Sequence, residues 1–135
     1  MVTQTFLESI SYRTIGCIYE VYNNLGPGLL ESVYQTCLIY ELRSNDIQVI
    51  EFPHVPIIYK GKNLGGRFQP DLLVEGVLLL ELKAVEHMIP LFNAQLLTYL
   101  KLSDKCKGLL VNFNTGKIRE SIHSIVTPAF FELGK

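Results

Sequence analysis

Apolar residues in the N-terminal third of the chain recur three and four positions apart, which is the period of one face of an α-helix. The first stripe predicts an amphipathic helix over residues 4–24. The segment Gly26-Pro27-Gly28 ends it, because glycine and proline interrupt helices. A second stripe predicts a helix over residues 30–44. The chain therefore begins with two consecutive helices.

Beyond residue 44, the apolar residues follow the pattern of β-strands, and one more helix lies among these strands. Pro90 favours the first position of that helix, which we expect over residues 90–102. The strands are expected at residues 47–52, 55–60, 67–74, 77–85, 108–113 and 117–122, with a turn at 62–66. This order predicts an α/β sandwich with a mixed β-sheet flanked by helices, and not a doubly wound nucleotide-binding fold.

The length of 135 residues and the 48% share of hydrophobic residues predict a single domain, spanning 1–135, with one packed core. No apolar run approaches the roughly 20 residues that cross a bilayer, and the first residues do not resemble a secretory signal. We therefore expect a cytoplasmic protein with no membrane partner.

The cysteines and the net charge exclude other classes of site. Cys17, Cys37 and Cys106 are too far apart for a zinc site or a disulfide framework, so we expect small buried hydrophobic side chains. The net charge of −1 gives no broad basic surface for binding a polyanion.

Charged residues follow directly after the most apolar expected strand segment, residues 77–80. Glu81 and Lys83 are two apart, so their side chains share one face of that strand. Buried charges are costly unless they are paired or bound to a metal. Asp71 lies opposite Glu81, on the same face, if residues 75–77 form a three-residue turn. We expect that turn; the alternative for these three residues is a structural ion pair on a hairpin.

Three further positions can join this group. Gln95 and Tyr99 are four apart and project from one face of the third helix. Glu31 lies in the first turn of the second helix, where a carboxylate can also serve simply as a partner for the helix dipole.

These residue types suit a hydrolytic metal site. Asp71, Glu81 and the carbonyl oxygen of Leu82 are hard oxygen ligands for Mg²⁺ or Mn²⁺, and Glu31 is a further candidate ligand. Such an ion lowers the pKa of a bound water and holds a phosphate oxygen.

The remaining polar residues have candidate roles in catalysis. Lys83 would hold or polarise the attacking water, or stabilise the charge that grows on the phosphate. Gln95 would orient the water or the scissile phosphate, and Tyr99 would support the same helix face.

The motifs resemble those of a known superfamily. Pro70-Asp71 with Glu81-Leu82-Lys83 resembles the PD-(D/E)XK nuclease signature, and Gln95-x-x-x-Tyr99 resembles the additional motif of its RecB-type branch. Residues 28–34, Gly-Leu-Leu-Glu-Ser-Val-Tyr, match the motif of the GxxExxY family of small proteins within that superfamily. The resemblance spans about residues 10–126.

The resemblance implies a restriction-endonuclease-like PD-(D/E)XK core and a Mg²⁺- or Mn²⁺-dependent nuclease. It puts Glu31 on the first core helix, Asp71 and Glu81 on a β-meander, and Gln95 on the second core helix. One departure is Arg67-Phe68-Gln69, where relatives often carry a glycine-aromatic-basic stretch.

Three functions stay open from the sequence. The first is hydrolysis of phosphodiester bonds, in DNA in preference to RNA. The others are a non-catalytic nucleic-acid-binding or protein-interaction module that keeps the fold, and a metal-dependent hydrolase for another phosphate substrate. The small size predicts that a homodimer or a partner protein supplies specificity, with Phe6, Leu7 and Ile10 as an exposed dimer face.

Overall fold

The computed structural model describes residues 1–135, apart from the side chains of residues 66 and 67, so the side chain of Arg67 lies outside the described residues. The chain begins with α1 (Gln4–Leu25) and α2 (Glu31–Ser44). The later elements are β1 (Val49–Glu51), β2 (Val55–Tyr59), β3 (Lys62–Phe68), β4 (Leu72–Val74), β5 (Leu78–Lys83), α3 (Pro90–Ser103), β6 (Lys107–Asn112), the 3₁₀ helix η1 (Ile118–Ser121), β7 (Ile122–Val126) and α4 (Pro128–Phe131). The three predicted helices are confirmed, with ends within about one residue.

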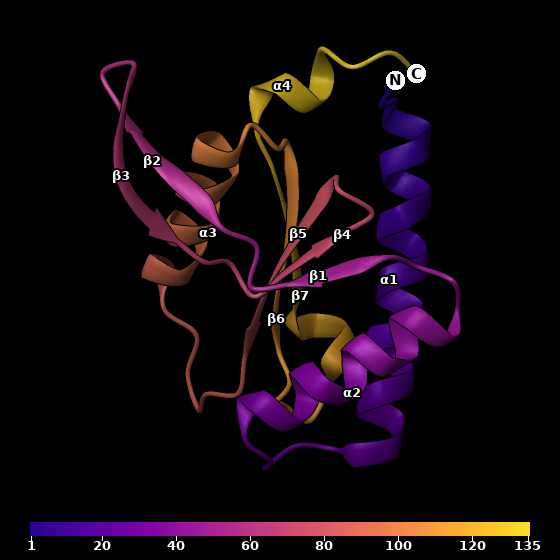
Figure 1. Cartoon of the computed structure of the whole chain (residues 1–135). Coiled ribbons are helices and arrows are strands. Elements are labelled where there is room, and N and C mark those ends of the chain that lie inside the picture. Colours follow the sequence, from indigo (N-terminus) through magenta and orange to yellow (C-terminus); the bar gives the residue numbers. More distant parts are fainter.

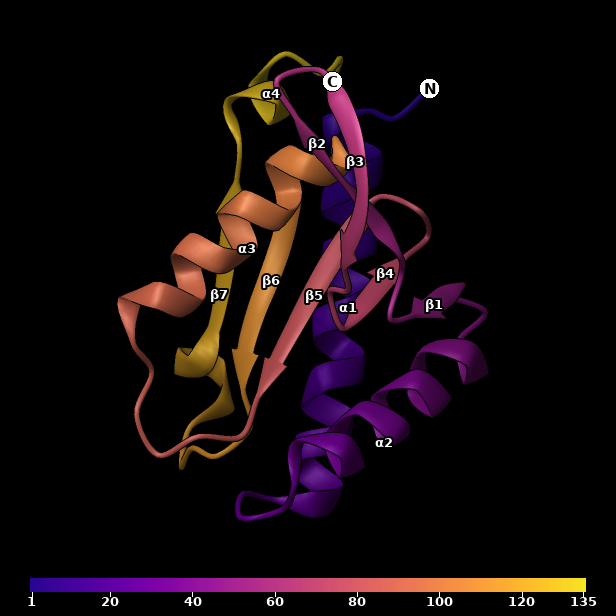
Figure 2. The same ribbon diagram turned by 60° about the vertical axis from the view of Figure 1, so that its left-hand side comes forward.

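Five strands form one mixed sheet in the order β1-β4-β5-β6-β7. The β5–β6 pair is parallel and the other pairs are antiparallel. The helix α3 connects β5 to β6, as parallel neighbours require a crossover connection. Figures 1 and 2 show α1 and α2 on one face of this sheet and α3 on the other. The expected mixed α/β sandwich is confirmed.

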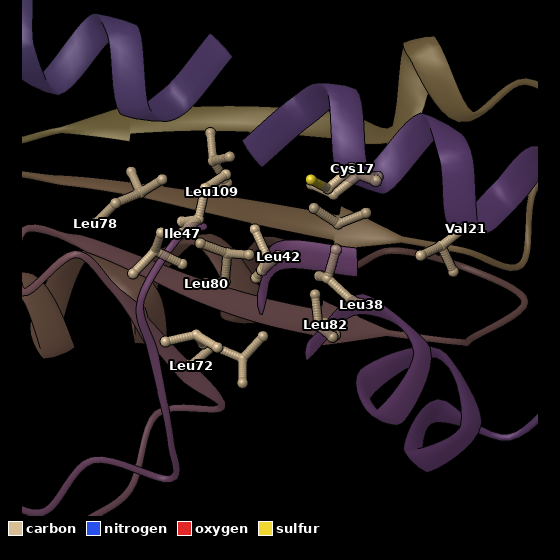
Figure 3. Packing of buried hydrophobic residues seen from close by; sticks show 14 of the residues in the cluster. Cys17, Val21, Leu38, Leu42, Ile47, Leu72, Leu78, Leu80, Leu82 and Leu109 are labelled. Carbon is tan, nitrogen blue, oxygen red and sulfur yellow. The ribbon is translucent and has the colours of Figure 1, made fainter. Parts of the chain in front are cut away.

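Alternate residues of β5 divide the core between the two faces of the sheet. Leu80 and Leu82 are fully buried in the larger hydrophobic cluster, which also contains Leu38 and Leu42 of α2 (Figure 3). Leu79 points the other way, into a smaller cluster under α3. Full burial of a leucine side chain contributes about 1.5–3 kcal/mol, so both faces fix the orientation of β5.

The length of the turn between β4 and β5 decides on which face of the sheet Asp71 lies. Val74 pairs with Leu78, which leaves residues 75–77 as a three-residue turn. Glu75 and Gly76 both have left-handed backbone conformations, with φ of 51° and 68°. Because Leu72 pairs with Leu80, Asp71 continues the same register opposite Glu81. The predicted three-residue turn is confirmed.

The prediction of a turn at residues 62–66 is wrong, because these residues belong to β3. The turn instead consists of Lys60 and Gly61, with φ of 51° and 76°, which is the two-residue geometry that suits a tight hairpin. The predicted strand over 67–74 is also wrong as a single element. It is interrupted between β3 and β4 around Pro70, which cannot donate a hydrogen bond to a ladder. The strands β2 and β3 therefore form a separate two-stranded sheet.

Two predictions near the chain ends are also wrong. Most of residues 117–122 form η1, and the last strand, β7, begins only at Ile122. Leu7 and Ile10, expected on an exposed dimer face, are buried in the core, and only Phe6 of that set is exposed. The apolar stripe of α1 faces the sheet, so it is occupied within the chain itself.

The prediction that the three cysteines are small buried side chains is confirmed in part. Cys17 is buried, Cys37 and Cys106 are partly buried, and all three are free thiols. In the described part of the chain, no helix combines the length and apolar character that crossing a membrane requires.

Gly108 of β6 lies where Leu96 of α3 packs closely on the sheet, and its replacement by valine should destabilise the fold. A Cβ atom there would lie 3.1 Å from the carbonyl oxygen of Leu79 and 3.1 Å from Cδ1 of Leu96. We expect Gly108→Val to lower the free energy of unfolding in urea by roughly 1–3 kcal/mol. Gly16→Ala, in open space on α1, is the matched control and should raise stability by up to about 1 kcal/mol. An unfolding midpoint unchanged by Gly108→Val would contradict this packing.

Candidate functional site

Asp71 and Glu81 each bind the other's strand across the β4–β5 hairpin. The N–H of Asp71 donates to Oε1 of Glu81 at 2.9 Å, and the N–H of Leu82 donates to Oδ2 of Asp71 at 2.7 Å. These two reciprocal hydrogen bonds, which we call the carboxylate clasp, fix the orientation of both side chains. Among the described residues, no further hydrogen bond engages the second oxygen of either carboxylate.

Burial raises the pKa values of both carboxyl groups of the clasp. Glu81 is only 6% exposed. Loss of hydration and then the neighbouring Asp71 charge raise the pKa of Glu81 to about 7, against the lowering effects of the Asp71 N–H and of Lys83. Burial also raises the pKa of Asp71, while the Leu82 N–H and the Lys83 charge lower it. The clasp therefore concentrates negative charge where water solvates it poorly, which favours a bound cation or a proton.

Glu31 is the first residue of α2, and its charge interacts electrostatically with the clasp residues. Burial and then the Asp71 charge raise the pKa of Glu31, and Lys83 lowers it. Within the described part of the chain, no hydrogen bond or ion pair joins the Glu31 side chain to the clasp. Glu31 therefore interacts with the clasp through its charge.

The loop that leads to Glu31 is held by Tyr34, which is fully buried. Its hydroxyl donates to the carbonyl oxygen of Gly26 at 2.6 Å and accepts from the N–H of Leu29 at 3.2 Å. Its ring stacks on Phe113 with centroids 4.4 Å apart. Tyr34 thereby links the start of α2 to the end of β6, and fixes the position of the helix turn that carries Glu31.

Lys83 ends β5 and is partly buried against α3. Its Nζ lies 4.4 Å from the ring centroid of Phe92, a distance at which the aromatic face attracts the ammonium. None of the ion pairs found among the described residues includes Lys83. The described residues of the hairpin therefore hold no ion pair of the kind that the structural alternative requires.

Gln95 and Tyr99 form the α3 side of the site. Nε2 of Gln95 donates to the Tyr99 hydroxyl at 2.9 Å, as the predicted common face requires. Burial and then the Glu81 charge raise the pKa of Tyr99, which places this pair within electrostatic reach of the clasp. The Tyr99 ring stacks on Phe68 of β3 with centroids 4.6 Å apart.

The two carboxylates of the clasp supply only some of the ligands that a metal ion requires. Its carboxylate oxygens are hard donors of the kind that Mg²⁺ and Mn²⁺ prefer. However, no group of three or more His, Cys, Asp or Glu side chains in the described residues is arranged to hold a metal ion. The structure thus brings Asp71 and Glu81 together and leaves Glu31 outside a close three-carboxylate group. Leu82 gives its N–H to Asp71, and a ligand role for its carbonyl oxygen stays a prediction.

The model of the PD-(D/E)XK nuclease superfamily matches residues 8–125, which is most of the chain. The chain belongs to the PD-(D/E)XK nuclease superfamily. Nucleases of this superfamily generally use divalent metal ions.

Other comparisons support the fold alone. The crystal structure of SSO0001 matches with a TM-score of 0.55 at 22% sequence identity, over 72% of this chain and 50% of SSO0001. This PD-(D/E)XK chain therefore spans half the length of that protein. A search of curated proteins gives no match.

Two aromatic residues of this PD-(D/E)XK site could not be assigned from motifs alone. Phe92 lies three positions before Gln95 on α3, so helical spacing could have placed it beside the site. Phe68 had no comparable signal, because its contact with Tyr99 depends on the path of the separate β2–β3 sheet.

Proposed function

We propose that this protein is a metal-dependent nuclease that hydrolyses phosphodiester bonds, in DNA in preference to RNA. Residues 1–135 act as one nuclease-like domain of the GxxExxY type, and a cytoplasmic location stays a prediction. The observation that carries the proposal is the carboxylate clasp, in which Asp71 and Glu81 are oriented by backbone N–H groups and held in poor solvent contact. Membership of a nuclease superfamily supports the same reading.

The ligand set follows from the donors beside the clasp. Asp71, Glu81 and the carbonyl oxygen of Leu82 would hold Mg²⁺ or Mn²⁺, and Glu31 would contribute directly or through a water. When bound, such an ion activates water and neutralises charge on a phosphate oxygen. The electrostatic interaction of Glu31 with Asp71 and Lys83 supports this ligand role.

Lys83 supplies the positive charge that a transferring phosphoryl group requires. Its ammonium is held by the Phe92 ring and acts electrostatically on all three carboxylates. A preoriented cation stabilises negative charge that grows in the transition state without reorganising. Gln95, braced by its hydrogen bond to Tyr99, would orient the water or the scissile phosphate.

Replacing Lys83 tests this function directly. With labelled single-stranded and duplex DNA and Mn²⁺ or Mg²⁺, we expect Lys83→Ala to lower the cleavage rate by roughly 10²–10³-fold, as loss of a charge-stabilising group does elsewhere. Lys101→Ala, at an exposed position on α3, should cut at the wild-type rate. Parallel RNA substrates test the preference for DNA.

Two results would overturn the proposal. DNA that is bound but never cut, with equal binding by Lys83→Ala, would indicate a non-catalytic binding module. Intact DNA together with turnover of nucleotides or model diesters would indicate a different phosphohydrolase. Light scattering of the active species would show whether it is a homodimer, and activity that requires a second protein would indicate a specificity partner.

A further inference from the structure

The β2–β3 hairpin stands apart from the main sheet and carries apolar side chains that the rest of the chain does not cover. Within the described part of the chain its strands pair only with each other, and they lie against α3 (Figures 1 and 2). Tyr59 is 60% exposed and Leu64 is 59% exposed. Ile57 and Ile58 are exposed as well. Apolar groups gathered on a two-stranded element mark an interaction surface.

The charge of this segment differs from that of the whole chain. Residues 52–70 include Lys60, Lys62 and Arg67 and no acidic residue, whereas the chain has a net charge of −1. Lys60 and Lys62 are exposed at either side of the tip, and the Lys60 ammonium lies 5.6 Å from the Tyr59 ring centroid. The hairpin therefore combines positive charge with an exposed aromatic ring, which complements a nucleic-acid strand.

The base of the hairpin is joined to the candidate site. Phe68, the last residue of β3, stacks on Tyr99, whose hydroxyl accepts the Gln95 hydrogen bond. Pro70 and Asp71 follow within three residues. A strand lying on the hairpin would thus lead toward the carboxylate clasp.

We propose that the β2–β3 hairpin binds an unpaired nucleic-acid strand that extends from the clasp, an inference that rests on the proposed nuclease function. Lys60 and Lys62 contact phosphates, and Tyr59 stacks on a base. An unpaired strand fits better than a duplex, because only unpaired bases expose their faces to Tyr59 and its apolar neighbours. The hairpin would supply substrate binding that the rest of the chain, in which acidic residues outnumber basic ones, does not provide.

The test measures binding without cleavage. A fluorescein-labelled 20-nucleotide DNA, single-stranded or paired, is titrated with protein in EDTA and followed by anisotropy. We expect the double variant Tyr59→Ala, Lys60→Glu to bind the single strand about tenfold more weakly than wild type, with less effect on the duplex. Its plot of log affinity against log salt should be shallower by roughly 0.7 for the lysine removed.

The matched control makes the same chemical changes on the opposite face of the sheet. Tyr12, 80% exposed on α1, and Lys135 are replaced in the double variant Tyr12→Ala, Lys135→Glu. This variant should bind within about twofold of wild type, and thermal melting checks that both variants fold.

Three outcomes would overturn the inference: equal binding by wild type and the hairpin variant, an equal loss in hairpin variant and control, or no binding of DNA by wild type. Hairpin-dependent binding without cleavage after Mn²⁺ is added would support the inference and count against the proposed nuclease function instead.

Discussion

Asp71→Asn is expected to abolish nearly all cleavage, lowering the rate by roughly a thousandfold or more, because it removes one of the two oriented carboxylates that would hold the metal ion. The substitution keeps an oxygen that can accept the Leu82 N–H, so the hairpin should stay folded. The measurement is the initial rate of cleavage of labelled DNA across a series of Mn²⁺ concentrations, compared at equal circular dichroism and melting temperature.

The matched control for this prediction is Asp46→Asn. Asp46 is exposed after the end of α2 and has a left-handed backbone conformation that asparagine also tolerates, with φ of 58°. We expect it to cut at the wild-type rate. A full rate for Asp71→Asn at saturating Mn²⁺ would remove Asp71 from the site.

The second large effect concerns the stability of the metal-free protein as pH rises. Glu81 has a pKa of about 7 in the folded chain and an ordinary value of 4.5. Between these values the folded state holds a proton that the unfolded state has lost, so the free energy of unfolding falls as pH rises. The loss attributable to Glu81 is on the order of 3 kcal/mol and is complete above pH 7, since one pKa unit corresponds to about 1.4 kcal/mol.

Urea unfolding in EDTA at pH 5 and pH 8 measures this loss. The variant Glu81→Gln should lose less stability over that range than wild type, whereas Glu132→Gln, at an exposed position, should behave as wild type. Millimolar Mn²⁺ should raise the melting temperature of wild type at pH 8 and leave Glu81→Gln unchanged. Equal pH dependence in wild type and Glu81→Gln would show that Glu81 is not buried as described.

The parts of the fold that the sequence predicted are those set by local periodicity. The helices α1, α2 and α3 carry apolar stripes and clear end signals, and β5 and β6 are short apolar runs. The position of Asp71 was predicted only by requiring that both carboxylates share one face, which a three-residue turn satisfies and a two-residue turn does not.

The errors arose where local signals were ambiguous. Gly65 and Gly66 suggested a turn, yet the turn lies at Lys60-Gly61, and the glycines belong to β3. The burial of Leu7 and Ile10 depends on the sheet that α1 covers, which the helix itself cannot reveal. In the site, motif spacing could identify Glu31 as a candidate residue. It could not predict how far Glu31 lies from the clasp, because that distance is set by the packing of α2 on the sheet.

The proposed nuclease function depends on the carboxylate clasp as a cation site, and a crystal soaked in Mn²⁺ tests this most directly. We predict an anomalous-scattering peak at about 2.0–2.3 Å from one oxygen each of Asp71 and Glu81, between the oxygen distances typical of Mg²⁺ and of Ca²⁺. A fully soaked crystal with no peak between these two carboxylates, or with a peak bound only by other residues, would contradict the account.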